Sequence, residues 1–296
     1  MKTRILLSAF VFAAIALQPL LHAQPIDVTI GGGLDNLAVD TQKLDGNYNL
    51  KSGAFELRPA WSARINGEIG RNFLFDVTYR QDPFWQSSFS GMFGLIFGAV
   101  HAGLGVQIGM HDYASGDFSY EKMSSWDTGL LGCFKLEYPG YFFVGTDFVA
   151  DFWGDMSEEG RSSRPYLSVF GGFWLPYILI TITYFQKEYV ETKAAGVKAR
   201  AALTKVGAEL EFFSKSSPFR VSIGGGWLRQ AISLSGGGAA RETFADYFNA
   251  DLGFSLELGL YARWFVKGGI PLDGLAPALA KFIFNTGFTF TIFGNK

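Results

Sequence analysis

The chain has 296 residues, a formal net charge of −2 and a single cysteine, Cys133. A nearly neutral chain lacks the basic surface that nucleic-acid binding requires, so no nucleic-acid partner is expected. A lone cysteine excludes an internal disulfide, and the charged fraction of 18 % lies below the ~25 % of soluble domains, which favours a membrane protein.

Residues 1–23 have the three parts of a secretory signal peptide. Two basic residues lie in the first four positions, an uncharged apolar run follows, and the run ends at the small-residue junction Leu21-His22-Ala23. Pro19 interrupts the run, which is shorter than the ~20 residues that a membrane-spanning helix needs. We therefore expect cleavage before Gln24 and one domain over 24–296. A retained N-terminal anchor helix is the alternative.

Alternation of apolar and polar residues is the strongest structural signal in the rest of the chain. From Phe55 to Asn66 the odd positions are apolar, whereas the even positions include Glu56, Arg58 and Arg64. A strand with lipid on one face and water on the other alternates in this way. No second uninterrupted apolar run reaches the ~20 residues of a membrane helix, so we expect membrane-spanning strands.

The same alternation recurs along the chain. It predicts strands, in chain order, at 28–37, 55–66, 73–82, 89–97, 100–110, 126–138, 141–153, 166–175, 178–187, 201–213, 219–230 and 282–292, with further strand structure at 248–267. The apolar phase switches between Phe97 and Val100, which predicts a two-residue hairpin at Gly98-Ala99. One phase persists over 248–267, as one long strand or as two around an odd-length turn near Leu258-Gly259. Because membrane strands need only about 9 to 11 residues, two are favoured.

These strands predict an all-β fold, a transmembrane antiparallel up-and-down β-barrel of about fourteen strands, with twelve or eight as alternatives. Short connections are predicted at 67–70, 98–99, 139–140, 176, 214–218 and near 259. Longer or more polar connections are predicted at 40–52, 83–88, 115–125, 154–164, 189–200, 233–245 and 269–280. Bacterial barrels have short periplasmic turns and long outer loops, so both termini are expected in the periplasm. A soluble sandwich or jelly roll also alternates, but it would not need so many Phe and Trp residues.

The last predicted strand carries a polar residue, a glycine and two spaced hydrophobic or aromatic residues, namely Asn285, Gly287, Phe290 and Ile292. This arrangement resembles the terminal-strand signal of bacterial outer-membrane proteins, which implies recognition by the barrel-assembly machinery. That family usually stops at the aromatic residue, whereas this chain continues through 293–296.

The whole mature chain is similar in pattern to porin-type and spirochaetal outer-membrane proteins. The short piece Arg164-Pro165-Tyr166 is similar to strands of OmpW-like small barrels, which would suggest eight strands. The resemblance implies a bacterial outer-membrane location and contact with outer-membrane lipid.

Charged residues on the polar face are expected to line the lumen. The acidic ones are Glu56, Asp76, Glu137, Asp147, Asp151, Glu209, Glu211, Asp251 and Glu257, and the basic ones are Arg58, Arg64, Arg80, Lys135, Lys187, Lys205, Arg220, Arg263 and Lys267. Equal numbers of both signs predict little charge selectivity and many cross-strand pairs. A purely structural ion-pair lattice is the alternative.

Two functions from different classes fit these expectations. The first is a pore for passive diffusion of small solutes, or of small apolar molecules if the lumen opens sideways into lipid. The second is a structural or adhesive barrel that binds host molecules through its outer loops, notably 35–53, 115–125 and 233–245.

Enzymatic and cofactor chemistry have little support in the sequence. Only His101 and His111 follow the signal peptide, and Asp112 and Ser115 are the nearby partners that a hydrolase site at His111 would use. The glycine-rich segment 103–109 alternates as a strand and no helix follows it, so no dinucleotide cofactor is expected. Neither histidine has a carboxylate at a metal-ligand spacing, so we expect no metal, no cofactor and no catalytic residue.

Overall fold

The structure of the chain is a computed structural model. It describes residues 25–35, 58–70, 72–82, 86–114, 122–153, 161–192, 197–214, 217–236, 241–272 and 283–292. The predicted signal peptide, the predicted loop 40–52 and the C-terminal tail 293–296 lie outside these residues. Within the described ranges, no helix is long and apolar enough to cross a membrane.

All regular elements of the described residues are strands. They are β1 (Ile26–Asp35), β2 (Arg58–Ile69), β3 (Phe73–Asp82), β4 (Gln86–Phe97), β5 (Val100–Ala114), β6 (Lys122–Tyr138), β7 (Phe142–Trp153), β8 (Ser162–Ser163), β9 (Tyr166–Trp174), β10 (Ile178–Thr192), β11 (Lys198–Phe213), β12 (Phe219–Ser235), β13 (Arg241–Glu257), β14 (Ala262–Pro271) and β15 (Ile283–Ile292).

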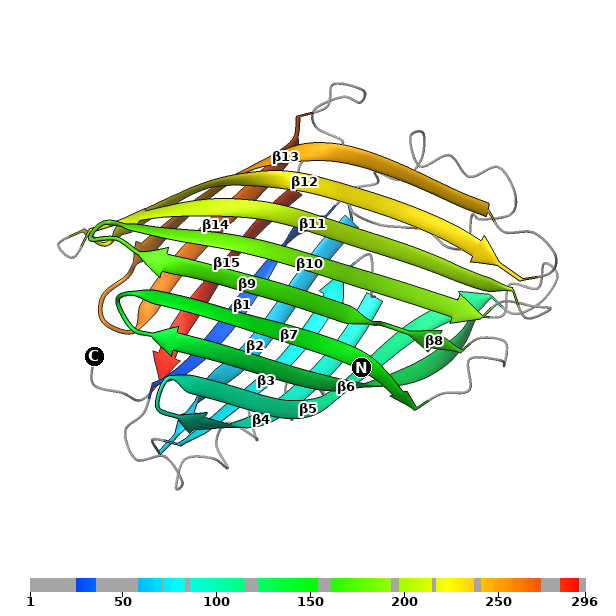
Figure 1. Cartoon of the computed structure of the whole chain (residues 1–296), viewed down its shortest axis with the longest axis horizontal. Helices are drawn as coiled ribbons and strands as arrows, with labels where there is room; N and C mark the ends of the chain where they lie inside the picture. The colour runs from blue at the N-terminus through cyan, green and yellow to red at the C-terminus, as the bar shows by residue number, and fades with distance from the viewer. Residues whose placement is uncertain are drawn as a thin grey trace.

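These strands form one antiparallel sheet that closes on itself (Figure 1). Consecutive long strands pair with one another, and β15 pairs with β1 to complete the ring. The two-residue β8 pairs only with β10, in line with β9. Among the described residues the barrel therefore has fourteen long strands, as the alternation predicts, and the alternatives of twelve and eight strands are wrong.

The predicted short turns lie together at one end of the barrel, where β1 begins and β15 ends (Figure 1). The hairpin at Gly98-Ala99 is confirmed, because Phe97 pairs with Val100. Segment 248–267, for which the sequence favours two strands over one, contains two, since Leu256 of β13 pairs with Trp264 of β14. Glycines in the left-handed region form these turns, with φ of 60° at Gly98 and 80° at Gly259, a conformation that costs glycine little.

The strands differ from the prediction mainly at the end opposite the short turns. β10 continues to Thr192 instead of ending at Lys187, β12 continues to Ser235, and β13 begins at Arg241 instead of Phe248. The predicted loops 189–200 and 233–245 are correspondingly shorter. Strands that extend beyond the lipid no longer need an apolar outer face, so the alternation that predicts them fades there.

The outward face of the barrel is apolar. Leu104, Ile182 and Leu252 are 63 %, 59 % and 60 % exposed. Aromatic side chains are exposed close to the short turns, at Phe97, Tyr138, Tyr141, Tyr177, Phe219 and Tyr261, and again toward the other end, at Trp126 and Phe244. An apolar band between two aromatic girdles is the surface of a membrane-spanning barrel.

Ion pairs mark the outer limit of this band. Arg200 Nε lies 2.8 Å from Glu188, and Arg229 Nε lies 2.7 Å from Asp246, all on the outward face. Arg229 lies ten residues after Phe219, the first residue of β12. Ten residues cover about 33 Å of strand, or about 25 Å of height at a tilt of ~40°, which matches the apolar band of outer-membrane barrels.

Labelling of single cysteines tests which face of β12 and β13 meets lipid. The test uses a Cys133→Ser background. A fluorophore attached to Leu252→Cys or to Val221→Cys should be quenched by nitroxide-labelled lipids, because both side chains point outward. Ser255→Cys and Ser222→Cys should instead react with a charged, water-soluble maleimide, because the register places both side chains on the inner face. The opposite pattern of reactivity would contradict the register.

Candidate functional site

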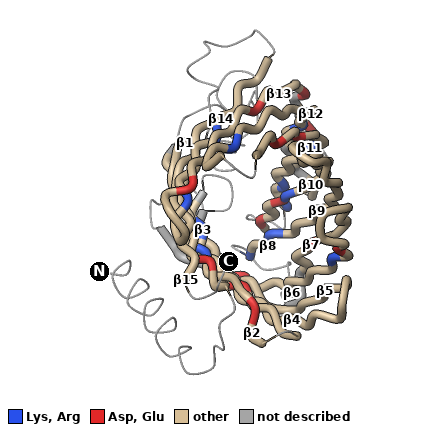
Figure 2. Tube along the Cα trace, turned by 90° about the vertical axis from the view of Figure 1, so that its left-hand side faces the viewer, with Lys and Arg blue, Asp and Glu red and all other residues tan. Residues whose placement is uncertain are grey.

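The inner face of the barrel carries the charges that the sequence assigns to the lumen. The register places fifteen of these charged residues on the inner face, opposite the exposed apolar side chains. They are Arg64, Asp76, Arg80, Lys135, Glu137, Asp147, Lys187, Lys205, Glu209, Glu211, Arg220, Asp251, Glu257, Arg263 and Lys267. Glu56 lies outside the described residues, and only the backbone is described for Arg58 and Asp151. Charged positions occur on both facing walls, the one that carries β1, β3 and β14 and the one that carries β9–β12 (Figure 2).

Most of these charges form ion pairs on the inner face. The pairs join Arg64 to Asp76, Lys135 to Glu137, Lys205 to Asp251 (2.6 Å), Lys267 to Glu209 (2.5 Å), and Arg220 to both Glu211 (3.0 Å) and Glu257 (3.3 Å). The cross-strand pairing expected from the balanced signs is therefore present. It leaves a smaller set of charges to act on a solute.

Glycines on β12 allow one of these ion pairs to reach past a neighbouring strand. Lys205 of β11 contacts Asp251 of β13 across β12, where the register places Gly224 and Gly226 on the inner face. Because these positions carry no side chain, the long lysine side chain has room to lie along the wall. Gly224 and Gly226 thus make room for this ion pair on the lumen wall.

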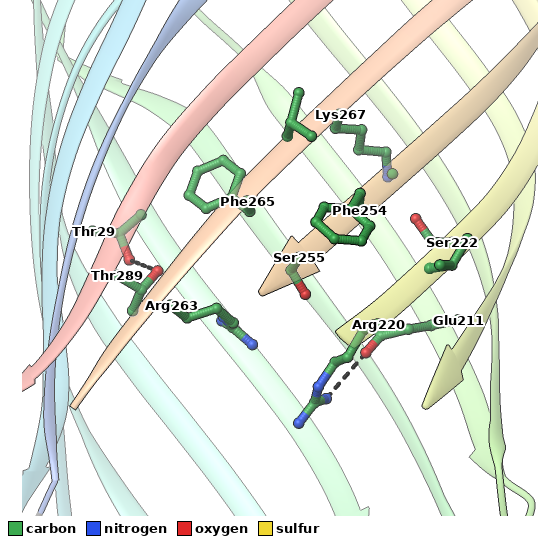
Figure 3. Close-up of a pocket in the computed structure, with 13 residues that line it drawn as sticks. Thr29, Glu211, Arg220, Ser222, Phe254, Ser255, Arg263, Phe265, Lys267 and Thr289 are labelled. Atoms are coloured by element: carbon green, nitrogen blue, oxygen red, sulfur yellow. Dashed lines mark hydrogen bonds and ion pairs between the residues drawn. The ribbon is translucent and has the colours of Figure 1, made fainter. Parts of the chain in front are cut away.

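The turn-side cavity lies inside the barrel near the short turns and has a volume of about 320 Å³. Hydroxyl groups and charges from six strands line it, namely Thr29, Ser222, Ser255 and Thr289 together with Glu211, Arg220, Arg263 and Lys267 (Figure 3). The hydroxyls of Thr29 and Thr289 are 3.0 Å apart. Arg263 is exposed and forms no ion pair with any described residue. Phe254, Phe265 and Val266 also line the cavity, which therefore combines charged, hydroxyl and apolar groups.

The cross-lumen cavity lies farther from the short turns and has a volume of about 250 Å³. Residues of β1, β2, β3 and β15 form most of its lining, and Lys187 of β10 reaches it from the facing wall. Arg80 is its other charged residue, and none of its described lining residues is acidic. Arg80 is exposed and has no ion-pair partner in the described part of the chain.

A buried charged cluster lies on the inner face toward the loop end. It consists of Arg164, Asp127, Ser162 and Tyr189, and we call it the Arg164 cluster. Arg164 forms an ion pair with Asp127, and the two side chains are only 1 % and 8 % exposed. Ser162 donates a 2.5 Å hydrogen bond to Asp127, and the guanidinium carbon of Arg164 lies 5.5 Å from the centre of the Tyr189 ring.

The Arg164 cluster lies where one seam of the barrel lacks backbone pairing. β7 and β9 pair only as far as Val149 and Tyr166, although β7 continues along β6 to Trp153. Pro165, next in line, has no N–H to donate to a ladder. Arg164 connects the β8–β9 side of this seam to Asp127 of β6 through side chains instead.

Several sequence-based expectations meet the structure only in part. Phe290 and Ile292 point outward and are 41 % and 40 % exposed, whereas Asn285 and Gly287 lie on the inner face; their recognition by the assembly machinery stays a prediction. The side chains of His111 and Asp112 are not described. Within the described ranges, no cluster of three His, Cys, Asp or Glu residues is placed to hold a metal.

Comparisons with known proteins place the fold but not the family. No protein-family model matches the chain, and no curated protein sequence matches it. The COG4313 outer membrane channel from Pseudomonas putida F1 is similar in structure, with a TM-score of 0.51 and 10 % identity over 91 % of this chain and 96 % of that one.

Two further solved structures are similar over most of their length. A loop-deletion mutant of OmpT, an outer membrane protein of Vibrio cholerae, has a TM-score of 0.42 and 10 % identity over 92 % of this chain and 98 % of that one. A porin has a TM-score of 0.40 and 10 % identity over 90 % and 99 %. The closed barrel, its apolar band and its aromatic girdles make the chain a bacterial outer-membrane β-barrel.

Proposed function

We propose that the barrel is a porin-like channel through which small water-soluble solutes cross the outer membrane by passive diffusion. The observation that carries the proposal is a lumen with two cavities, each lined in part by charged and hydroxyl-bearing side chains. Water and small polar solutes are stabilised by such a lining, whereas an adhesive or purely structural barrel does not need it. The proposed passage involves no covalent step and no cofactor.

The strand number supports a narrow pore. Barrels of eight strands are filled by their own side chains, whereas those of sixteen to eighteen strands enclose an aqueous channel. Fourteen strands lie between these sizes, and the ion pairs along the inner wall reduce the free width further. The similarity in fold to an outer-membrane channel agrees with this proposal.

Conductance measurements test the proposal directly. Purified mature protein, refolded and inserted in planar bilayers, should give discrete current steps of uniform size. Liposomes that contain the barrel should swell in a small neutral sugar and respond more slowly to larger ones. Silent bilayers after insertion of barrels shown to be folded by their heat-dependent gel mobility would contradict a diffusion pore.

A further inference from the structure

We infer that the cross-lumen cavity is a binding site for small anions that carry a carboxylate or phosphate group, at a point of the solute path that two facing walls of the barrel both line. The inference rests on the proposed pore function and adds the class of solute. Its basis is the position of Arg80 and Lys187 on facing walls of the same cavity.

The ring order shows that the cavity is lined from opposite sides of the barrel. β2 and β10 are diametrically opposite, with six long strands between them in either direction. Nevertheless, Ser62 of β2 and Lys187 of β10 line the same cavity of about 250 Å³. The Lys187 side chain therefore reaches into the same cavity that Arg80 lines from the other wall. A solute that crosses the barrel here passes between Arg80 and Lys187.

The charge at this cavity is positive although the whole inner face is nearly balanced. Ion pairs neutralise Arg64, Lys205 and Lys267 elsewhere in the lumen. Arg80, in contrast, presents an exposed guanidinium that has no acidic partner among the described residues, and no described carboxylate lines the cavity. The local charge that a solute meets in this cavity is thus set by its basic lining, in which Arg80 is the exposed cation.

The lining suits a small oxyanion. A guanidinium presents parallel N–H donors that match a carboxylate or a phosphate, and an ammonium adds a second positive charge. Ser62 and Asn285 contribute neutral polar groups to the lining, and Gly31 and Gly33 of β1 add no side chains to the wall that carries Arg80. The volume is smaller than the ~300 Å³ at the lower end of drug-sized pockets, so the site fits a compact anion such as a short dicarboxylate.

Block of the single-channel current by added solutes tests the site. Succinate and inorganic phosphate serve as the carboxylate and phosphate probes, and erythritol serves as the neutral probe of similar size. Succinate or phosphate should reduce the current through wild-type channels at millimolar concentration, and erythritol should not. The probe with the lower half-blocking concentration identifies the preferred group. Channels that conduct but that neither anion blocks would overturn the inference and leave the pore proposal standing.

Matched variants separate this site from the general charge of the lumen. Arg80→Gln and Lys187→Gln should each raise the half-blocking concentration about tenfold, as expected for the loss of one charge-assisted contact. Arg80→Lys, which retains the charge, should raise it less. Arg263→Gln makes the same charge change in the turn-side cavity and should alter it by less than about twofold. Equal effects of Arg80→Gln and Arg263→Gln would overturn the site.

A binding measurement distinguishes failure of the site from failure of the pore. If wild-type barrels conduct nothing, the pore proposal fails, and calorimetric titration of the detergent-solubilised barrel with succinate decides the site alone. Binding heat that Arg80→Gln abolishes and Arg263→Gln preserves supports it. The absence of binding heat in the folded wild-type barrel overturns it.

Discussion

Replacement of Arg164 with leucine should lower the free energy of unfolding by about 3 to 5 kcal/mol. Arg164 and Asp127 are both buried, so removal of the guanidinium leaves a poorly solvated carboxylate for which, among the described residues, the Ser162 hydroxyl is the remaining donor. The same change removes the connection across the unpaired seam between β7 and β9. Urea-driven unfolding of the barrel in lipid vesicles, followed by tryptophan fluorescence, measures the loss.

A double variant and an exposed pair serve as controls for this prediction. Asp127→Leu combined with Arg164→Leu should recover much of the stability, because two apolar side chains replace a buried charge pair without leaving either charge alone. Arg200→Gln breaks the outward pair with Glu188, whose arginine is 48 % exposed, and should cost at most about 1 kcal/mol. If the double variant is as unstable as the sum of the two single variants, the Arg164–Asp127 contact does not stabilise the barrel.

The strands and their number could be predicted because two solvents act on each strand at once. Lipid outside and water inside require apolar and polar residues to alternate. The phase of this alternation predicts each strand and its lipid-facing side, and the switch of phase predicts the Gly98-Ala99 hairpin. The turn near Gly259 could be predicted from length alone, since one strand over 248–267 would exceed the membrane. The inner-face position of charges such as Arg80 and Lys187 follows from the same alternation.

What lies opposite a residue across the lumen could not be predicted in this way. Alternation places Arg80 and Lys187 on the inner face, but their shared cavity depends on the ring order and on the shape of the barrel, to which strands far apart in sequence contribute. The Arg164 cluster could not be predicted either, because Arg164 and Asp127 are far apart in sequence and contact each other only through their side chains. Pro165 is the local signal that could have indicated an interrupted strand there.

Replacement of Gly105 with valine should prevent normal pairing of β4 and β5 and lower the free energy of unfolding by about 3 kcal/mol. A Cβ atom at Gly105 would lie 2.6 Å from Cα of Met92 and closer still to the carbonyl oxygen of Gly91. These are backbone atoms of the neighbouring strand, which cannot move aside as the end of a flexible side chain can. Vesicle-based urea unfolding and the yield of the heat-sensitive folded band on gels measure the effect.

Gly91 on the adjacent strand provides the matched control. A Cβ there meets nothing within 4 Å, because the position faces outward on β4 beside the exposed Phe93. Gly91→Val should therefore change stability by less than about 0.5 kcal/mol, and in the favourable direction, since valine suits a strand and lipid contact better than glycine. If both valine variants lose stability equally, the glycines serve backbone flexibility in assembly. If only Gly105→Val loses stability, glycine is required at position 105 because the backbones of β4 and β5 lie too close on the inner face for a side chain.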